Sequence, residues 1–598
     1  MPAAAINTRN QSPEPRTGQE PAQVSGGLTD LQMGFGIRWL CRENSPVVWR
    51  TAWNERRDVC LHFSGEHFID PEKMPGRTTE GHRWDGDGTA YLVRRYEELG
   101  LDFLAGINGW FSGLLIDFRV KKAVLFNDRY GLGRIYYHQN SEAFFFSSEA
   151  KSLLAALTRT RSLDERGLAE WLSCGCVLQD RTLFSGIALL PPGSAWTFSA
   201  DGSLQKDRYF SPETWESQPP LSPTEYYERL LETFPRILKR YGDGPKKIAM
   251  SLTGGLDGRM IMAWSPFGPG ELPCYTFNGP VRDCADVKLA RRVAQACGQT
   301  HQTLTLDDPF FTEFPQLAGK AILASDGAMD VTGAAELYLN RLARQIAPVR
   351  LTGNYGSEIL RRHVAFRPRA LPGELFSPDC GQLIQTAART YAQEAAGNRL
   401  AFIAFKQVPW HHFSRFAVER SELAVRSPFL DNDLVALAFQ APLESAASLE
   451  PTLRLIADGN PRLGLIPTDR GVTYPAGGAA NRLHRSVAEF LAKAEYACDY
   501  GMPGWLARAD RCLTPLRLER WFLGRQKFCH FRSWYRRPLA GFVKEVLLDP
   551  RSRTRSYLNG SALEPMVAGH IRGTRNCTVE IHKLLTLELI HRLLLDPS

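Results

Sequence analysis

The chain has 598 residues, of which 43% are hydrophobic and 23% charged, and its net charge is +8 at pH 7. This length exceeds what one hydrophobic core supports, so we expect more than one globular domain. The modest charge, without a basic face interleaved with aromatic residues, predicts no nucleic-acid partner. No long apolar run occurs and the first residues are polar, which predicts no membrane span and no secretory signal.

Twelve cysteines are thinly spread, and no Cys-x-x-Cys pair occurs. A zinc site and a disulfide scaffold are therefore not expected in a chain of this size. Reduced, mostly buried cysteines are typical of a cytoplasmic protein, and that is the location we expect.

Residues 1–30 are rich in Pro, Gln, Ser, Gly and Thr, a composition that predicts a disordered extension. Residues 31–210 consist mainly of short apolar strands separated by turns. Apolar positions in 91–99 recur with helical spacing, so a helix is expected there. The expected strands, four of which form two hairpins, are 59–63, 113–118, 122–126, 135–138 and 143–147.

A Pro- and Ser-rich linker is expected at 211–223, followed by one large domain at 224–598. The first part of this domain alternates strands and helices, expected at 226–241, 248–250, 273–277, 286–297, 301–306 and 349–352. Such alternation predicts a parallel sheet with helices on its faces and ligands beyond the carboxyl ends of its strands. Helical spacing dominates from about residue 374, as at 540–548 and 583–595.

One stretch of this domain combines a buried strand, a glycine turn and the start of a helix. Its residues are Ser251, Leu252, Thr253, Gly254, Gly255, Asp257 and Gly258. Glycines let a backbone approach a ligand closely, and amide groups at a helix start attract anions. A carboxylate such as Asp257 beside them suits a metal that accompanies a phosphate. The pattern predicts a pyrophosphate and Mg²⁺ cradle, although glycine turns before helices also serve purely structural roles.

Five motifs, in the same order along the chain, resemble those of the asparagine synthetase family. They are 127–137, 146–151, 181–184 with 190–193, 253–258 and 425–431. The resemblance runs from about residue 33 to the C terminus. It implies an α+β sandwich of the class II glutamine amidotransferase type at 31–210. An α/β parallel-sheet domain of the ATP pyrophosphatase (HUP-like) type, with a helical C-terminal part, is implied for 224–598.

The front half departs from that family at its catalytic residues. A class II amidotransferase uses an N-terminal cysteine as nucleophile and its free amine as base. This chain begins Met1-Pro2, its residues 33–36 replace Met-Cys-Gly-Ile, and Cys41 is interior. Ser64-Gly65-Glu66 replaces the Asn-Gly-Glu oxyanion segment, while Asp87 matches the aspartate that holds the substrate amine. We expect a retained scaffold without glutaminase activity, unless cleavage before Cys41 restores a terminal cysteine.

The second metal carboxylate of the family is expected between Gly353 and Glu358, where two alignments compete. Without a gap, Ser357 replaces the metal aspartate. With one inserted residue, Glu358 takes the metal role and Tyr355 falls where β-lactam synthetases carry a catalytic tyrosine. We prefer the second, because two carboxylates suit Mg²⁺ better than one. A helix-capping role for Glu358 stays as the alternative.

Further positions carry family roles by resemblance alone. Arg470 stands nearest to the lysine that stabilises charge during acyl transfer, and it keeps the positive charge. Thr276 and Phe277 match the strand that contacts adenine. Asp286 matches an acidic residue at a helix start, with a helix N-cap as the equal alternative. Asp326 lies where the acceptor-side loop is expected, and it is equally a turn residue.

The resemblance implies an ATP-dependent ligase that activates a carboxylate as an acyl-adenylate, which an amine or ammonia then attacks. ATP and Mg²⁺ are the implied cofactors, and a small-molecule or peptide carboxylate is the implied substrate. Relatives that also lack the N-terminal cysteine include β-lactam synthetases and lasso-peptide cyclases. A homodimer or an association with a biosynthetic partner is compatible with the sequence.

Two alternatives stay open. One is a divergent asparagine synthase that hydrolyses glutamine, and the other is a non-catalytic nucleotide-binding or regulatory protein. Retention of Gly254, Gly255, Asp257, Glu358 and Arg426 argues against the second alternative.

Overall fold

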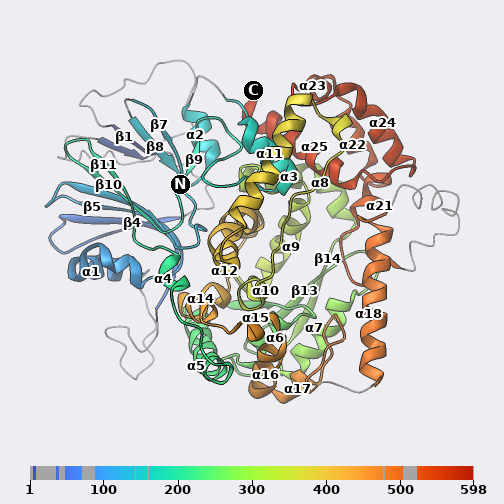
Figure 1. Cartoon of the computed structure of the whole chain (residues 1–598), viewed down its shortest axis with the longest axis horizontal. Coiled ribbons are helices and arrows are strands. Elements are labelled where there is room, and N and C mark those ends of the chain that lie inside the picture. Colours follow the sequence, from blue (N-terminus) through green and yellow to red (C-terminus); the bar gives the residue numbers. More distant parts are fainter. Residues whose placement is uncertain are drawn as a thin grey trace.

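The structure is a computed structural model that describes residues 4–7, 36–39, 48–69, 88–141, 143–157, 161–475, 479–502 and 522–596. Over these residues the chain starts with antiparallel sheets, continues through a parallel sheet and ends in helices, which Figure 1 colours from blue to red. The expected succession of an antiparallel front part, a parallel sheet and a helical C-terminal part is confirmed.

The larger front sheet has the strand order β11-β10-β6-β5-β4-β3, and its neighbouring strands run antiparallel. The strands are β3 (Trp49–Trp53), β4 (Val59–Phe68), β5 (Asn108–Asp117), β6 (Lys122–Asn127), β10 (Ser194–Ser199) and β11 (Leu204–Arg208). Strand β5 is buried along its whole length because both faces of the sheet are covered. Leu114 packs with Phe146 of the second sheet, while the next residue, Leu115, packs with Leu92 of α1 (Thr89–Leu99).

The second front sheet has the order β2-β1-β8-β7-β9. Its strands are β1 (Ala4–Asn7), β2 (Gly36–Trp39), β7 (Tyr136–Gln139), β8 (Ala143–Ser147) and β9 (Ala188–Leu189). Both predicted hairpins are confirmed, as β5–β6 and β7–β8. Strand β1 differs from the disorder predicted for 1–30, because a composition averaged over thirty residues hides a short segment that pairs with β8. The rest of that range lies outside the described residues.

The helices of the front part and of the connection to the second half are α1, η2 (Gly100–Gly106), α2 (Ala150–Ala156), α3 (Glu165–Cys174) and α4 (Glu213–Glu216). The predicted linker 211–223 therefore carries a helix. Its Trp215 is buried against Phe210, with ring centroids 4.6 Å apart. This aromatic contact packs the Pro- and Ser-rich segment onto the protein.

The second half opens with a parallel sheet of order β14-β13-β12-β15-β16. Its strands are β12 (Ile248–Ser251), β13 (Cys274–Asn278), β14 (His301–Thr305), β15 (Val349–Thr352) and β16 (Ala424–Arg426). The chain moves outward from β12 to β14 and then returns to add β15 on the other side of β12. The strand order reverses between β12 and β15, and this point is where open α/β sheets form a crevice.

Helices surround this sheet and make up the rest of the chain. Between the strands lie α5 (Pro223–Gly242), α6 (Leu256–Ala263), α7 (Ala285–Ala296), α8 (Asp308–Ser325) and α9 (Gly333–Ile346). After β15 come α10 (Gly356–Arg361), η3 (Gly373–Leu375), α11 (Pro378–Glu394), α12 (Arg399–Phe402), the π-helix η4 (Ile403–His412) and α13 (Phe413–Arg420).

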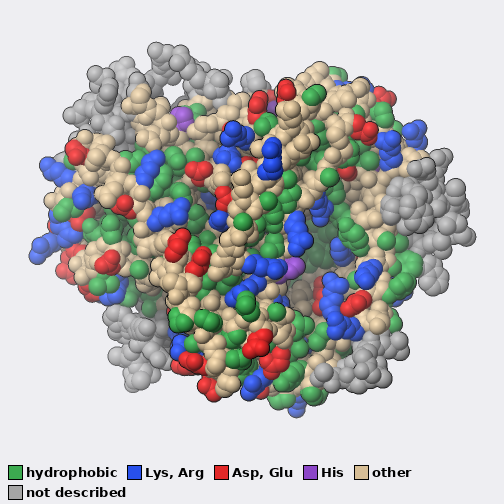
Figure 2. Space-filling model, viewed as in Figure 1, with side chains coloured by type: hydrophobic (Ala, Val, Ile, Leu, Met, Phe, Trp, Pro, Cys, Tyr) green, Lys and Arg blue, Asp and Glu red, His purple; other side chains and the backbone are tan. Residues whose placement is uncertain are grey.

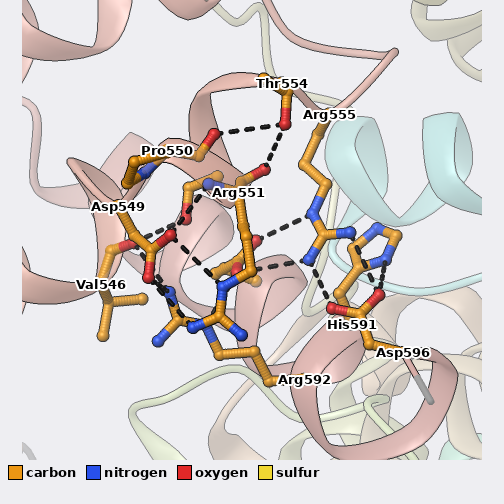
Figure 3. Close-up of polar contacts among 11 residues, drawn as sticks. Val546, Asp549, Pro550, Arg551, Thr554, Arg555, His591, Arg592 and Asp596 are labelled. Atoms are coloured by element: carbon orange, nitrogen blue, oxygen red, sulfur yellow. Dashed lines mark hydrogen bonds and ion pairs between the residues drawn. The ribbon is translucent and has the colours of Figure 1, made fainter.

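Beyond β16 the described elements are η5 (Pro428–Leu430), α14 (Asn432–Phe439), α15 (Leu443–Ala447), α16 (Glu450–Gly459), α17 (Pro461–Gly464), α18 (Ala479–Cys498), α21 (Phe531–Arg536), α22 (Ala540–Leu547), α23 (Pro550–Arg553), α24 (Gly560–Ile571), α25 (Thr578–Ile590) and the π-helix η7 (His591–Leu595). The helices predicted at 540–548 and 583–595 are confirmed. Figure 3 shows how charges hold the last turn: Arg592 Nη2 lies 2.9 Å from Asp549 Oδ2, and Arg555 Nη2 lies 2.8 Å from Asp596 Oδ2.

The two halves are joined by buried polar contacts. Asp326 accepts hydrogen bonds from the backbone N–H groups of Ala150 (2.8 Å) and Lys151 (3.1 Å), which open helix α2. The residue that starts α2, Glu149, provides no side-chain cap of its own. Asp326 thus caps a helix of the other half, a role that neither sequence alternative included. Across the described residues, no helix combines the length and apolar character that a membrane crossing requires.

Candidate functional site

Two turns meet at the point where the strand order reverses. The first follows β12 and leads into α6, and the second follows β15 and leads into α10. A Cβ atom on Gly353 would lie 2.6 Å from the backbone nitrogen of Gly258, and one on Gly356 would lie 2.5 Å from Cγ of Asp257. Only glycine at these two positions lets the turns touch, and the contact sets Asp257 against the start of α10.

Asp257 is held by groups from the second turn. Its Oδ1 accepts a hydrogen bond from Arg361 Nη2 at 2.7 Å, and its Oδ2 accepts one from the backbone N–H of Ser357 at 3.0 Å. Burial raises the pKa of Asp257, and the positive charge of Arg361 opposes that shift. The carboxylate is therefore fixed in direction, and its charge is balanced by Arg361.

Glu358 lies beside Asp257 but has a different environment. Its Oε2 accepts a hydrogen bond from the hydroxyl of Ser357 at 2.8 Å. Its Oε1 lies 3.7 Å from Nε2 of His412, and burial lowers the pKa of His412 to about 4. His412 is neutral at pH 7, so the negative charge of Glu358 has no cationic partner among the described residues.

Tyr355 is the residue immediately before α10, and its backbone lies in the left-handed region, with φ of 72°. Such a conformation is uncommon for a residue with a side chain, and residues held in it often lie at active sites. The buried ring stands edge-on to Trp110 and to His412, with centroid distances of 6.0 and 5.4 Å. Burial raises the pKa of the Tyr355 hydroxyl well above its usual value, so it stays protonated at pH 7.

These groups surround a cavity of about 250 Å³. The sequence-predicted residues that line it are Ser251, Thr253, Gly255, Asp257, Gly258, Gly353, Tyr355 and Glu358. Ser357 lines it as well, so both alignments of the 353–358 segment place a side chain in the cavity. Figure 2 shows Lys, Arg and His side chains around a hollow near the centre of the visible face, in the region where Figure 1 labels α10 and β13.

Other predicted residues lie behind or beside this cavity. The Gly254 N–H donates to Asp286 Oδ1 at 2.8 Å, and the Gly255 N–H donates to Thr253 Oγ1 at 3.3 Å. These two amides thus have partners within the protein, and the pyrophosphate role expected for them stays a prediction. Asp286 fixes the glycine turn instead of capping α7, and burial raises its pKa to about 6.

The residues expected to contact adenine, Thr276 and Phe277, and the one expected to assist acyl transfer, Arg470, do not line this cavity. The Thr276 hydroxyl donates to the carbonyl of Leu252 at 2.7 Å and thereby ties β13 to β12. Phe277 lies under the guanidinium of Arg350, 5.1 Å from the ring centroid. The Arg470 side chain is 64% exposed and lies 3.7 Å from Asp469, on a segment whose backbone contacts Gly254.

Several lining residues were not among the sequence predictions: Arg350, Thr352, Asn354, His412, Arg415, Phe416 and Glu419. Arg350 is buried in β15, where Nη2 donates to Ser251 Oγ at 3.0 Å and Nη1 lies 3.0 Å from Glu419 Oε1. The sequence could have indicated this contact, because Arg350 stands in the middle of a short apolar strand. A buried charge is costly without a partner, so such an arginine predicts a buried ion pair. Arg415 pairs with Glu336 and completes this network.

The front half holds no activated thiol among its described residues. Burial raises the pKa of Cys60 to about 12 and that of Cys174 to about 11, and it raises the pKa of Cys176 well above its usual value. Glu66 of the Ser64-Gly65-Glu66 segment pairs with Arg426, whose Nη2 and Nε lie 2.8 and 3.1 Å from its two oxygens. Cys41, Asp87 and residues 33–35 lie outside the described residues.

Comparisons with known proteins bear on both halves. Residues 53–210 match a family described as "Glutamine amidotransferase domain". The chain is 22% identical over 352 residues to asparagine synthetase [glutamine-hydrolyzing] 1 of Bacillus subtilis, a match that covers 57% of this chain and 54% of that protein. It is also 22% identical over 346 residues to a putative asparagine synthetase [glutamine-hydrolyzing] 2 of Methanocaldococcus jannaschii, covering 55% of this chain and 62% of that protein.

A third relative is "Amidase chry2" of Gibberella zeae, 24% identical over 315 residues, with 46% of this chain and 43% of that protein covered. The chain thus spans about half the length of the curated relatives that it matches. Among solved structures, the glutamine phosphoribosylpyrophosphate amidotransferase of B. subtilis covers 50% of this chain and 59% of its own at 11% identity. Its TM-score of 0.20 is too low to support an argument.

The front part matches an amidotransferase domain, and a parallel sheet with a two-carboxylate cavity follows it. Over about half of its length, the chain is similar to asparagine synthetases.

Proposed function

We propose that this protein is an ATP-dependent ligase that joins a carboxylate to an amine or to ammonia and releases AMP and pyrophosphate. The observation that carries the proposal is the contact of the two turns, which brings Asp257 and Glu358 into one cavity at the carboxyl edge of the parallel sheet. A crevice at such a point is the usual ligand site of open α/β sheets. The strand order also suits the ATP pyrophosphatase type of domain that the family resemblance implies.

In the proposed reaction, a carboxylate oxygen of the substrate attacks the α-phosphorus of ATP. The bond to the bridging oxygen breaks, and pyrophosphate leaves with its electron pair. The nitrogen of the amine then attacks the acyl carbon and loses a proton, and AMP leaves. Both steps develop negative charge on phosphate oxygens, so fixed positive groups and donors at the cavity favour them.

The chain's own residues would orient these groups. The hydroxyl of Tyr355 is protonated and can donate a hydrogen bond to a developing negative oxygen. Arg350 is locked by Ser251 and Glu419, so its guanidinium presents a fixed positive charge at the cavity wall. Trp110 and Phe416 pack edge to face at 5.0 Å, which forms an apolar side that helps to exclude water.

The two carboxylates fit a magnesium site. Glu358 has no cationic partner among the described residues, and Asp257 is directed by Arg361 and Ser357 toward the same cavity. Within the described residues no group of three or more metal-ligating side chains occurs. Mg²⁺ is usually bound by one or two protein carboxylates together with substrate phosphates, which agrees with this pair. When bound, it would neutralise charge on the leaving pyrophosphate.

We further propose that the front domain hydrolyses no glutamine. Each cysteine that the structure describes in this domain is buried and has a raised pKa, which disfavours the thiolate nucleophile. Glu66 is occupied by Arg426 of the second half. The nitrogen would then come from free ammonia or from an amine of the substrate, and the front domain would act as a scaffold.

The test is a pyrophosphate-release assay with ATP, Mg²⁺ and a panel of carboxylic acids. Asp257→Asn and Glu358→Gln should each lower release by about 100-fold or more, because each removes a charge that the reaction needs. Asp201→Asn, a change in a fully exposed turn, is the matched control and should leave the rate unchanged. Pyrophosphate release that survives Asp257→Asn would show that the site is assigned wrongly.

A second candidate function is asparagine synthesis with glutamine hydrolysis, which is favoured by the names of the two asparagine synthetase relatives. Formation of asparagine from aspartate, ATP and glutamine, with glutamate released, would support it and would refute the inactive front domain. A third candidate is nucleotide binding without turnover. Calorimetric binding of ATP with no pyrophosphate released from any acid would favour that role.

A further inference from the structure

A second cavity, of about 330 Å³, lies where the front half meets the π-helix η4. Leu190, Pro191 and Pro192 contribute to one wall, and Phe405, Pro409 and Trp410 of η4 contribute to the other. The contact is close, because a Cβ atom on Gly131 would lie 2.9 Å from Pro192 and 3.2 Å from Pro409. None of the residues that line this cavity lines the one around Asp257.

Three arginines line this second cavity, and the carboxylates of Asp180 and Glu394 line it with them. Among the described residues, none of Arg129, Arg134 and Arg208 forms an ion pair, whereas Lys406 is neutralised by Glu394 at 2.8 Å. Arg129 is only 9% exposed, and its Nε has no hydrogen-bond partner among the described residues. Of the three, only Arg129 is buried. A buried guanidinium without an ion pair is costly, so Arg129 in particular would gain from an anion in the cavity.

The remaining contacts of these arginines are to carbonyls and rings. Arg129 Nη2 donates to the carbonyl of Ala105 at 2.5 Å, and its guanidinium lies 4.8 Å from the ring centroid of Phe210. Arg134 donates to the carbonyl of Pro409 and lies over Phe413, with 3.5 Å from Cζ to the ring centroid. Such contacts hold the guanidinium groups in place but leave their positive charge unbalanced.

The lining chemistry indicates the kind of ligand. Prolines, leucines and aromatic rings exclude water and favour an apolar body, while the arginines favour one anionic group. A bare inorganic anion would leave the apolar walls in contact with water. The size is near the lower end of small-molecule pockets, which are typically about 300–1,000 Å³.

The π-helix η4 joins the two cavities. Pro409 and Trp410 line the second cavity, and His412, at the end of the same helix, lines the first beside Tyr355 and Glu358. π-Helical segments occur frequently at functional sites because they re-aim side chains at a cost in backbone geometry.

We propose that this cavity is a second binding site, separate from the cavity around Asp257. Its ligand would be a small organic carboxylate with an aromatic or branched apolar body. The inference goes beyond the proposed ligase reaction and does not depend on it. Its basis is the set of arginines without an ion pair, together with the apolar side chains of the same cavity between the two halves.

The test is calorimetric titration of the full chain, without ATP, with 3-phenylpropanoate as the probe. We expect saturable 1:1 binding, and binding of the neutral 3-phenylpropanamide weaker by about tenfold or more. Arg208→Gln changes an exposed residue of β11 that lines the cavity, and it should weaken the acid by about tenfold. Lys206→Gln, on the same strand but away from the cavity, is the matched control and should leave the affinity unchanged.

Several results would overturn the proposal. They are equal binding of the amide, unchanged affinity in Arg208→Gln, or no saturation up to about 10 mM acid. If inorganic phosphate binds as tightly as the acid, the proposal that the ligand has an apolar body is refuted. Loss of binding in Asp257→Asn would place the acid in the first cavity instead. Failure of the ligase assay would leave these binding results unaffected, so the two proposals fail separately.

Discussion

The contact between the two turns predicts the effect of adding a single methyl group. In Gly353→Ala, the new Cβ would lie 2.6 Å from the backbone nitrogen of Gly258 and 2.9 Å from the carbonyl carbon of Asp257. Both are backbone atoms in the first turn of α6, so no flexible side chain can move aside. The φ angle of Gly353 is not in the left-handed region, and the effect is therefore one of space alone.

The magnitude follows from the size of the clash. Relief requires the two turns to separate by roughly 0.5–1 Å, and overpacking of this kind typically costs about 1–3 kcal/mol. The thermal midpoint of the affected transition should fall by a few degrees. Because Asp257 sits on the displaced turn, pyrophosphate release should fall by about 100-fold, the usual effect of a 1 Å displacement of a reacting group.

The assay is differential scanning calorimetry together with pyrophosphate release. The midpoint shift is compared instead of a free energy, since a chain of several domains does not unfold in one step. Gly541→Ala is the matched control: it lies in α22 with nothing within 4 Å of the new Cβ. Alanine is favoured over glycine in a helix by about 0.5–1 kcal/mol, so this variant should melt at the same or a higher temperature.

Gly356→Ala separates the loss of stability from the loss of activity. Its Cβ would lie 2.5 Å from Cγ of Asp257, so it displaces the carboxylate more than the backbone. We expect a smaller fall in midpoint than for Gly353→Ala and a similar loss of activity. If Gly353→Ala melts like Gly541→Ala and retains activity, the two turns are not in contact and the reasoning is refuted.

The remaining predictions concern charged groups. Arg426→Met removes the partner of Glu66 and should destabilise the chain by roughly 2–3 kcal/mol. Adding Glu66→Gln to this variant should restore part of the loss in the thermal midpoint. A double variant that melts no higher than Arg426→Met would contradict the pairing. Burial raises the pKa of Glu66, but the charge of Arg426 outweighs it and the net pKa is lowered from 4.5. The stability from this pair is present above the unfolded pKa and is lost as the pH falls through the lower folded value. Wild type should therefore lose midpoint below about pH 4.5 more steeply than Glu66→Gln, and parallel curves would count against the shift. Burial raises the pKa of Asp499 from 3.8 to about 7, so the folded chain binds the extra proton and stability falls as the pH rises between these values. Asp499→Asn should flatten the melting profile between pH 4 and 7, and a profile as steep as that of wild type would refute the assignment.

Sequence reasoning succeeded where the signal is local. The hairpins β5–β6 and β7–β8 and the parallel strands β12 to β15 follow from short apolar runs bounded by turn residues. The cavity segments 251–258 and 353–358 were both identified, although about a hundred residues separate them. Each is a strand that ends in a glycine turn, and carboxyl ends of neighbouring parallel strands lie on the same edge of a sheet.

The sequence by itself thus determined the order of the elements, the two turns and the residue types available for catalysis. Only the tertiary structure decided which charges meet. Asp286 binds the amide of Gly254, Asp326 caps a helix of the other half, and Arg426 pairs with Glu66. Strand and turn preferences depend on neighbours within a few residues, so they can be inferred from a segment. The partner of a buried charge is set by packing between distant segments, because its cost is offset only by whichever group the fold brings within a few ångströms.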